Sequence, residues 1–591
     1  MRLSTSERIR QYILVHGHVI YLIVAWLLTA VEIDWLLGQF CSMTYLSKFS
    51  LGQSFIWGGI IVFPFLLLPP RYRWIQLILF SVLVVFNMVN CLYLRNFSNF
   101  IPLRTIFMWQ GINVFTFRAA LASVAWSDAI LWLALCGQIG LYWAMRKQLR
   151  SRGFNLRFKV GCCIVILSGL VLMERSRYRG FVNWWEGAFD RSAINMEAYL
   201  QITCSLWDYD RKGYFEAYLI QLYNLFKPVI PLSSDEAEEI RKIISYSGNR
   251  DMAYDVDSIV DKNRDKNLIF IIVESLNSCA LNRTFDNKSF TPCMDSIIKA
   301  PDVICFDNIS SQAMFGQSSD GQFMYNTGVY PLIDETTLAV ERTGPFPSIC
   351  RELPKHHSAE FIGESRLIWF HDETTVAYGY DELNDDLEDY RGLDGDEAIF
   401  AAAFQSLKTM RQPFFVLITT ISMHGPYEFK GKLPDGWEEP ASTYDFLCKT
   451  NIFDRSLSLF LSDLKKSGLY DNSVIVIAAD HKATLSSLGA GGTDDGRIMF
   501  CVLNSGLSGK VDSRIAGQID VYPTILDIMG VRNPRWPGMG QSLIREVPGF
   551  AVVRGTEIVG DTTDTAAIER QKRNWQLSDR MIKTNTFPSL H

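Results

Sequence analysis

The stretch Asn267-Leu-Ile-Phe-Ile-Ile-Val-Glu-Ser275 decides the fold of the second half of this chain. Its apolar residues 268–273 are mostly β-branched, which is typical of a strand buried on both faces of a sheet. Similar runs follow at Val303–Phe306, Ala359–Ile362, Phe414–Thr419, Ser473–Ala478 and Ile498–Leu503.

Helical patterns lie between these runs, at Ser318–Thr327, Asp396–Met410, Asp454–Ser467 and Val521–Met529. Strands that alternate with helices in this way predict an α/β domain with a mostly parallel central sheet. In such a sheet, binding sites lie beyond the carboxyl ends of the strands. We therefore look for chemistry at those ends.

Charge divides the 591-residue chain, whose formal net charge is −6, into two unlike parts. Residues 1–180 hold 18 Lys+Arg against 5 Asp+Glu, whereas the remainder holds 39 against 58. The basic residues flank apolar runs and form no basic face, which excludes nucleic-acid binding. This distribution predicts a membrane anchor that is joined to an acidic soluble domain.

Five apolar stretches stand out in the basic part, at about 19–40, 53–70, 74–94, 128–145 and 158–173. Each can be extended to the roughly 20 residues that a membrane-spanning helix needs. Lys and Arg gather before the first stretch, between the second and third, and between the fourth and fifth. Positive-inside bias then predicts a cytoplasmic N-terminus, five transmembrane helices and an extracytoplasmic α/β domain.

Two acidic residues, Glu32 and Asp34, interrupt the first apolar stretch. A charged side chain at the bilayer centre costs about 2.5–3.5 kcal/mol on insertion scales. The span can slide toward Tyr12, which leaves both acids at the outer interface, or both can face the bundle near a lipid headgroup. We favour the first interpretation.

Side chains of the kinds that bind metals follow three of the expected strands. Glu274 follows the first strand directly, Asp480 and His481 follow the run at 473–478, and His424 follows the run at 414–419. Ser318 opens a predicted helix, where backbone N–H groups and the positive helix end favour a phosphate. Their shared position at strand ends predicts one site.

The ordered combination of these motifs resembles the lipoteichoic acid synthase and phosphoglycerol transferase family. That family consists of membrane-bound members of the alkaline phosphatase/sulfatase superfamily, and the resemblance covers about residues 262–545. It implies a multi-pass protein of the bacterial cytoplasmic (inner) membrane. The domains expected are a five-helix transmembrane domain at 1–175, a helical neck at 176–260, a sulfatase-like catalytic domain at 261–548 and a C-terminal tail at 549–591.

The resemblance also implies a set of site residues. Glu274, Asp480 and His481 would hold one divalent cation, and Ser318, where the family usually has Thr, would be the fourth ligand and the nucleophile. A hydroxyl bound to a divalent cation ionises more readily than a free one. Mn²⁺ is the cation expected, with Zn²⁺ or Mg²⁺ as alternatives.

The reaction implied is metal-dependent transfer of a phospholipid headgroup, phosphoglycerol first, to an envelope glycan or lipid through a phosphoserine. His424, Trp369 and His371 would bind the substrate. The glycerol-phosphate polymerases have Arg where this chain has His371 and His where it has Ile362. An imidazole that titrates does not replace a guanidinium that binds phosphate through two hydrogen bonds. The sequence therefore fits the transfer of a single headgroup at least as well as polymerisation.

Three other functions stay open: a phosphoethanolamine transferase, a phosphodiesterase or phosphatase of the same superfamily, and a non-catalytic membrane-tethered binding protein. The presence of all four expected metal-site side chains disfavours the last. A sulfatase is excluded because the stretch Cys293-Met-Asp-Ser-Ile297 lacks the Pro and Arg of the formylglycine motif.

Cysteines number twelve, and seven of them lie after residue 180. Because seven is odd, at least one thiol of the soluble part stays unpaired unless it bridges two chains. Cys305 and Cys501 fall in predicted buried strands, where we expect inert cysteines. A bridge such as Cys279–Cys293 stays open.

Overall fold

The structure is a computed structural model, and it describes residues 5–40, 46–97, 100–104, 124–151, 154–188, 214–245, 262–363, 366, 368–390, 392–393, 395–425, 427, 429–483, 496–507 and 509–588. The chain divides into two compact units, one comprising 1–103 with 120–227 and the other 104–119 with 228–591. Much of the predicted neck, 189–213 and 246–261, lies outside the described residues. The domain boundaries expected from the sequence stay a prediction.

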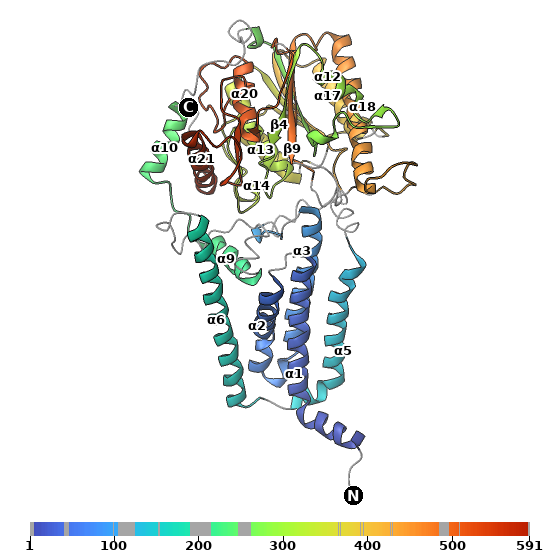
Figure 1. Ribbon diagram of the computed structural model, residues 1–591, viewed down its shortest axis with the longest axis vertical. Coiled ribbons are helices and arrows are strands. Elements are labelled where there is room, and N and C mark those ends of the chain that lie inside the picture. Colours follow the sequence, from blue (N-terminus) through green and yellow to red (C-terminus); the bar gives the residue numbers. More distant parts are fainter. Residues whose placement is uncertain are drawn as a thin grey trace. The chain divides into compact units, whose positions relative to one another are not determined.

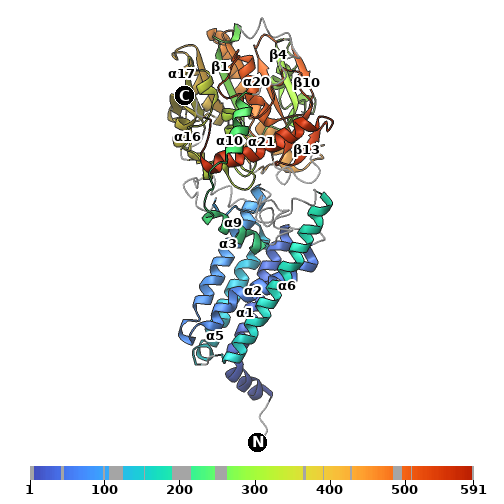
Figure 2. The same ribbon diagram turned by 90° about the vertical axis from the view of Figure 1, so that its left-hand side faces the viewer.

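Long helices form the first unit and lie side by side (Figures 1 and 2). They are α1 (Thr5–Phe40), α2 (Leu46–Leu67), α3 (Ile75–Phe97), α5 (Ala129–Ser151) and α6 (Leu156–Ala188). Three segments of the described part are long and apolar enough to cross a membrane, namely His16–Ile33, Pro70–Arg95 and Trp126–Arg150. The chain is therefore a membrane protein, whereas five crossings and their orientation stay predictions.

The first unit carries its polar groups inside and apolar side chains outside. Tyr21 donates a 2.9 Å hydrogen bond to Gln76, which in turn donates to Gln138 at 3.0 Å, and all three side chains are buried. Val82 and Leu133 are 61% and 68% exposed. This arrangement suits lipid as the surrounding solvent, because hydrocarbon does not satisfy polar groups.

Glu32 lies inside this unit, with its side chain 2% exposed and the side-chain amide of Asn87 beside it. Neither carboxylate oxygen has a hydrogen-bond partner in the described part of the chain. Glu32 therefore faces the interior of this unit, as the second interpretation expects, whereas its depth in the membrane stays a prediction. The side chain of Asp34 lies outside the described residues. By contrast, Asp128 accepts two hydrogen bonds from Arg95, at 2.6 and 2.7 Å.

We predict that Glu32→Leu stabilises the protein, because the change removes two buried oxygen atoms that have no hydrogen-bond partner among the described residues. The gain should be about 1–3 kcal/mol, the usual cost of an unsatisfied buried group. Thermal unfolding in detergent should then show a melting temperature a few degrees higher. The matched change Asp128→Asn should lower it, because Arg95 loses its partner. A loss of stability in both variants would contradict this view of Glu32.

A nine-stranded sheet forms the second unit, in the order β10-β4-β9-β8-β1-β7-β5-β6, with β11 paired to β4. The strands are β1 (Asn267–Val273), β4 (Val303–Ser310), β5 (His357–Ile362), β6 (Glu382–Asn384), β7 (Phe414–Thr419), β8 (Ser473–Ala479), β9 (Arg497–Leu503), β10 (Lys510–Asp512) and β11 (Ala516–Gly517). All neighbouring strands in this sheet are parallel except β9, which runs antiparallel to β8 and β4. The prediction of an α/β domain with a mostly parallel sheet is confirmed.

Strand β1 lies within the core, and all seven of its residues are buried. Helices cover both faces of the sheet (Figure 1). On one side lie α12 (Pro292–Ile298), α17 (Gly395–Leu407) and α18 (Ala441–Ser467), and on the other α13 (Ser318–Thr327) and α20 (Val521–Ile528). Helix α18 begins at Ala441 instead of Asp454, directly after Pro440. A proline fits just before or at a helix start, because the first N–H groups lack partners there.

Antiparallel pairing of β4 with β9 places Cys305 directly opposite Cys501. The two form a disulfide, which the expectation of inert cysteines in buried strands did not include. Both are buried, as expected, but sequence alone does not give the register of strands so far apart in the chain. Cys279 and Cys293 are not disulfide-bonded.

Candidate metal centre

The ends of two adjacent strands bring the acidic residues of the site together. Strand β1 ends at Val273, which is paired with Ala479, the last residue of β8. Glu274 and Asp480 follow directly, so they leave the sheet at the same level. Both side chains are buried, at 5% and 0% exposure.

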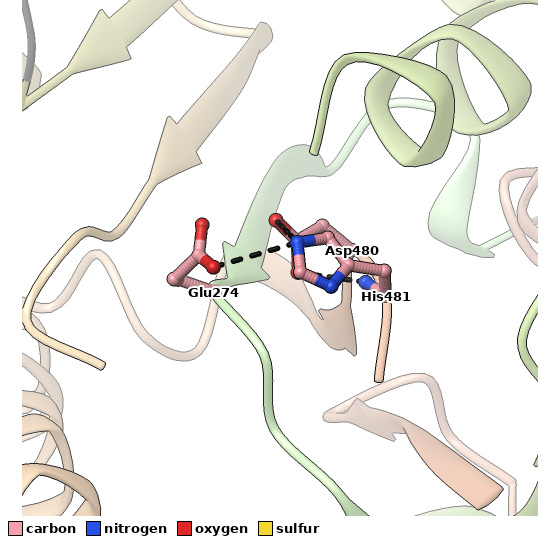
Figure 3. A group of neighbouring side chains, drawn as sticks. All are labelled: Glu274, Asp480 and His481. Carbon is pink, nitrogen blue, oxygen red and sulfur yellow. Dashed lines mark hydrogen bonds and ion pairs between the residues drawn. The ribbon is translucent and has the colours of Figure 1, made fainter. Parts of the chain in front are cut away.

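His481 and Ser318 complete the group of predicted residues. The nearest ligand atoms of Glu274, Asp480 and His481 all lie within 4.8 Å of one another (Figure 3). The His481 Nε2 atom is 3.4 Å from Glu274 Oε1 and 3.6 Å from Asp480 Oδ2. Ser318 Oγ donates to Glu274 Oε2 at 3.1 Å and lies 3.2 Å from His481 Nε2.

Electrostatics within this group favour a bound cation. Burial and the nearby charge of Glu274 raise the pKa of Asp480. Burial also opposes ionisation of Glu274, but the charge of His481 outweighs it and lowers the Glu274 pKa. Burial disfavours the imidazolium form of His481, yet the two carboxylates raise its pKa overall. Both carboxylates can be ionised together only if positive charge lies beside them, and His481 supplies part of it.

One oxygen atom of the group has no hydrogen-bond partner among the described residues, although an ion-pair distance joins it to His481. Asp480 Oδ2 is buried and accepts no hydrogen bond from the described residues. Two carboxylates, an imidazole and a hydroxyl form a donor set that suits a divalent cation such as Zn²⁺ or Mn²⁺. The residues therefore fit a metal ion, although their chemistry does not distinguish one metal from another.

Polar side chains that the sequence reading missed fix the two carboxylates. Ser275, in the left-handed region with φ 53°, donates its N–H to Asp480 Oδ1 at 2.8 Å and its hydroxyl to Glu274 Oε1 at 2.7 Å. Glu274 donates its own N–H to Thr420 Oγ1 at 3.1 Å, and Gln518 donates to the Asp480 carbonyl. Ser275 and Thr420 each lie just after the end of a strand, and that position in the sequence could have indicated that they belong to the site.

A tight turn sets the start of α13 and thereby the direction of Ser318. The Asp320 carboxylate accepts the N–H groups of Met314 and Gly316, both at 2.9 Å. A Cβ atom at Gly316 would lie 2.3 Å from Asp320 Oδ1, so the turn requires glycine there. Ser319, the neighbouring hydroxyl, instead donates to the Gly316 carbonyl and is fully buried.

His424 lies near the four-residue group, and its charge interacts with that of Glu274. The turn that carries it is held by Asp396, whose Oδ1 accepts the N–H groups of Ile421 and Ser422 at 2.7 and 2.9 Å. The sequence indicated Asp396 only as part of a helix start, because its partners lie far along the chain.

Trp369 and His371 do not belong to the four-residue group. They follow β5, which is separated from β1 by β7. Trp369 and Phe370 both adopt left-handed backbone conformations, with φ 52° and 58°. His371 is 2% exposed, and its Nδ1 atom lies 3.1 Å from Glu360 Oε1.

Comparison with known proteins shows which families this chain resembles. Residues 266–531 match the Sulfatase family. Lipoteichoic acid synthase 2 of Bacillus subtilis is 28% identical over 330 residues, which cover 50% of this chain and 51% of that relative, about half its length. Lipoteichoic acid synthase 1 of the same organism is 23% identical over 576 residues, which cover 89% of this chain and 85% of that relative. Residues 266–531 thus resemble sulfatases, and the chain is similar to lipoteichoic acid synthases.

Solved structures show the same fold. The lipoteichoic acid synthase LtaP of Listeria monocytogenes is 20% identical with a TM-score of 0.50, and the match covers 59% of this chain and 99% of that one. The lipooligosaccharide phosphoethanolamine transferase A of Neisseria meningitidis is an integral membrane protein. It is 10% identical with a TM-score of 0.50, over 86% and 95% of the two chains. At these identities the likeness concerns the fold alone.

We predict that Asp480→Asn removes most of the metal-binding capacity, because it takes away one of two carboxylates. After dialysis of the full-length protein against Mn²⁺, mass spectrometry should find at least about tenfold less bound metal than in the wild-type protein. Loss of a residue that only hydrogen-bonds to a metal ligand already lowers metal affinity by about that factor. The matched change Asp463→Asn, on the outer face of α18, should leave the metal content unchanged. Equal metal content in the two variants would rule out the site.

Proposed function

We propose that this protein transfers a phospholipid headgroup, phosphoglycerol first, to an envelope glycan or lipid acceptor through a phosphoserine on Ser318. One observation carries the proposal: the Ser318 hydroxyl lies 3.1 Å from Glu274 and 3.2 Å from His481, at the centre of the buried charges. A hydroxyl in that position is activated, whereas a structural serine would bond to backbone groups, as Ser319 does.

Glu274, Asp480, His481 and Ser318 would hold the cation, with Mn²⁺ preferred. When bound, the cation lowers the pKa of the hydroxyl and so favours the alkoxide. Ser318 Oγ attacks the phosphorus, a bond from Oγ to phosphorus forms, and the bond from phosphorus to the diacylglycerol oxygen breaks. Glu274 Oε2 accepts a hydrogen bond from the Ser318 hydroxyl, and it would take the proton as the bond from Oγ to phosphorus forms.

His424 would supply the proton that the leaving diacylglycerol oxygen needs. In the second step the acceptor hydroxyl gives its proton back to His424 and attacks the phosphoserine. The bond between phosphorus and Ser318 Oγ breaks, and Oγ takes its proton back from Glu274, which restores the serine hydroxyl. Asp396 keeps the turn of His424 in place through both steps, since it anchors two consecutive backbone N–H groups.

A membrane-embedded donor accords with the apolar helices of the first unit. We infer a multi-pass protein of the bacterial cytoplasmic membrane, with a cytoplasmic N-terminus and an extracytoplasmic catalytic domain. The distribution of Lys and Arg supports this orientation. Donor lipids of the outer leaflet and envelope acceptors would then lie on the same side as the metal centre.

The headgroup would be bound by Trp369, His371 and His424. Glu360 is 1% exposed, and it accepts a hydrogen bond from Thr375 at 2.5 Å as well as contacting His371. A carboxylate partner on Nδ1 fixes the orientation of an imidazole, and a protonated His371 held in this way would attract an anionic headgroup. Because His371 is not an arginine, phosphoethanolamine is the second candidate headgroup.

We predict that Ser318→Ala abolishes release of diacylglycerol from mixed bacterial phospholipids in the presence of Mn²⁺. The rate should fall by at least about 10³-fold, in the range seen when a nucleophile is removed. Ser319→Ala is the matched control, and it should retain most of the rate because Ser319 contacts only the backbone. Chromatographic measurement of diacylglycerol gives both rates. Equal activity of the two variants would exclude Ser318 as the nucleophile.

We further predict that Glu360→Gln weakens donor binding more than it slows the chemical step. With Nδ1 no longer held by a carboxylate, KM for the phospholipid should rise about tenfold, whereas kcat should change little. His371→Asn should raise KM in the same way. Steady-state kinetics in mixed micelles gives both constants. Unchanged KM in both variants would remove His371 from the proposed headgroup site.

A further inference from the structure

A large cavity in the second unit lies away from the metal centre. Its volume is about 1100 Å³, and its walls come from α10 (Ser234–Ser245), the end of α20, the segment 530–548 and α21 (Thr565–Thr584). Cavities of this size hold ligands larger than a single headgroup.

Contacts with the residues before β1 place this cavity near the amino end of that strand, whereas the metal centre lies beyond its carboxyl end. Asn263 and Arg264 donate hydrogen bonds to the carbonyls of Ile528 and Gly530, at 3.1 and 3.2 Å. Gly530 lines the cavity, whereas Glu274 follows the other end of β1. A seven-residue strand spans roughly 23 Å, at about 3.3 Å per residue, so the two sites are distinct.

Two buried polar side chains in the cavity wall have no partner. Gln571 on α21 is 2% exposed, and neither atom of its amide group makes a hydrogen bond within the described residues. Ser542, in the facing segment, is 6% exposed, and its hydroxyl is likewise unpaired there. Buried polar groups are almost always hydrogen-bonded, and an orphaned pair beside a cavity indicates a ligand that satisfies it.

Charged groups of both signs line the cavity. The basic ones are Lys242, Arg532, Arg545, Arg570 and Arg573, and the acidic ones are Glu239, Asp527, Glu546 and Asp564. Arg573 bonds to Glu239 and Arg545 to Asp527, so these two are neutralised. Lys242 on α10 is exposed and makes no ion pair with any described residue. An ammonium, a hydroxyl and a free amide are together suited to alternating phosphate and hydroxyl groups.

We propose that this cavity binds an anionic polyol-phosphate chain, the distal part of the acceptor, while the acceptor's reacting hydroxyl lies at the metal centre. The role as acceptor rests on the proposed headgroup transfer, but the binding itself does not. Gln571 and Ser542 contact the hydroxyl groups of the chain, and Lys242 contacts its phosphates.

Isothermal titration calorimetry of the full-length Ser318→Ala protein in detergent tests this proposal. Titration with a glycerol-phosphate hexamer in EDTA removes any contribution from a bound metal and from turnover. We expect binding that persists in EDTA. Lys242→Gln should weaken it at least about tenfold, as expected when a hydrogen bond to a charged group is lost, and Gln571→Leu about fivefold, as expected for a neutral hydrogen bond. The control Lys466→Gln, on an exposed turn of α18, should leave Kd unchanged.

Three results would overturn the proposal. They are no binding of the hexamer in EDTA, equal affinity in all variants, and equally tight binding of the neutral sugar maltohexaose. Lys242 is exposed, so its substitution tests the site even if Gln571→Leu is poorly folded. Failure of headgroup transfer itself would appear as absent diacylglycerol release from the wild-type protein, with hexamer binding intact.

Discussion

Two buried carboxylates at the ends of adjacent parallel strands are the constraint on which the rest of this structure depends. Glu274 and Asp480 are brought level by the pairing of β1 with β8, and both side chains are buried. Like charges in a poorly solvated site repel strongly and favour protonation. The arrangement becomes favourable only with positive charge between them, which His481 supplies in part and a divalent cation would complete.

The surrounding structure holds this pair in place and directs Ser318 toward it. Ser275 bonds to both carboxylates from a backbone conformation that few non-glycine residues adopt. On the other side, Asp320 fixes the turn before α13, so that Ser318 faces the charges while Ser319 faces the backbone. A single turn thus gives two neighbouring serines different surroundings, so that only the Ser318 hydroxyl lies beside the charged residues.

The strands and the central site residues could be predicted because their signals are local. A run of buried β-branched residues marks a strand, and Glu274 or Asp480 directly after such a run marks its end. The direction of β9 could not be predicted, because an apolar run reads the same in parallel and antiparallel pairing. The disulfide of Cys305 with Cys501 follows from that direction and was missed for the same reason.

Partners that lie far apart in the chain account for the other omissions. Asp396 resembles an ordinary helix start until the fold brings Ile421 and Ser422 to its carboxylate. Likewise, the local sequence around Glu32 does not show that this residue faces the interior of its unit, because Asn87, which lies beside its carboxylate, belongs to another helix.

The most direct test of headgroup transfer is to look for the covalent intermediate. The wild-type protein would be incubated with mixed bacterial phospholipids and Mn²⁺, quenched in acid, digested and sequenced by tandem mass spectrometry. An added phosphoglycerol mass on Ser318 is the predicted result, and a phosphoethanolamine mass on the same residue would change only the headgroup. Diacylglycerol release with Ser318 unmodified throughout the time course would contradict a phosphoserine mechanism.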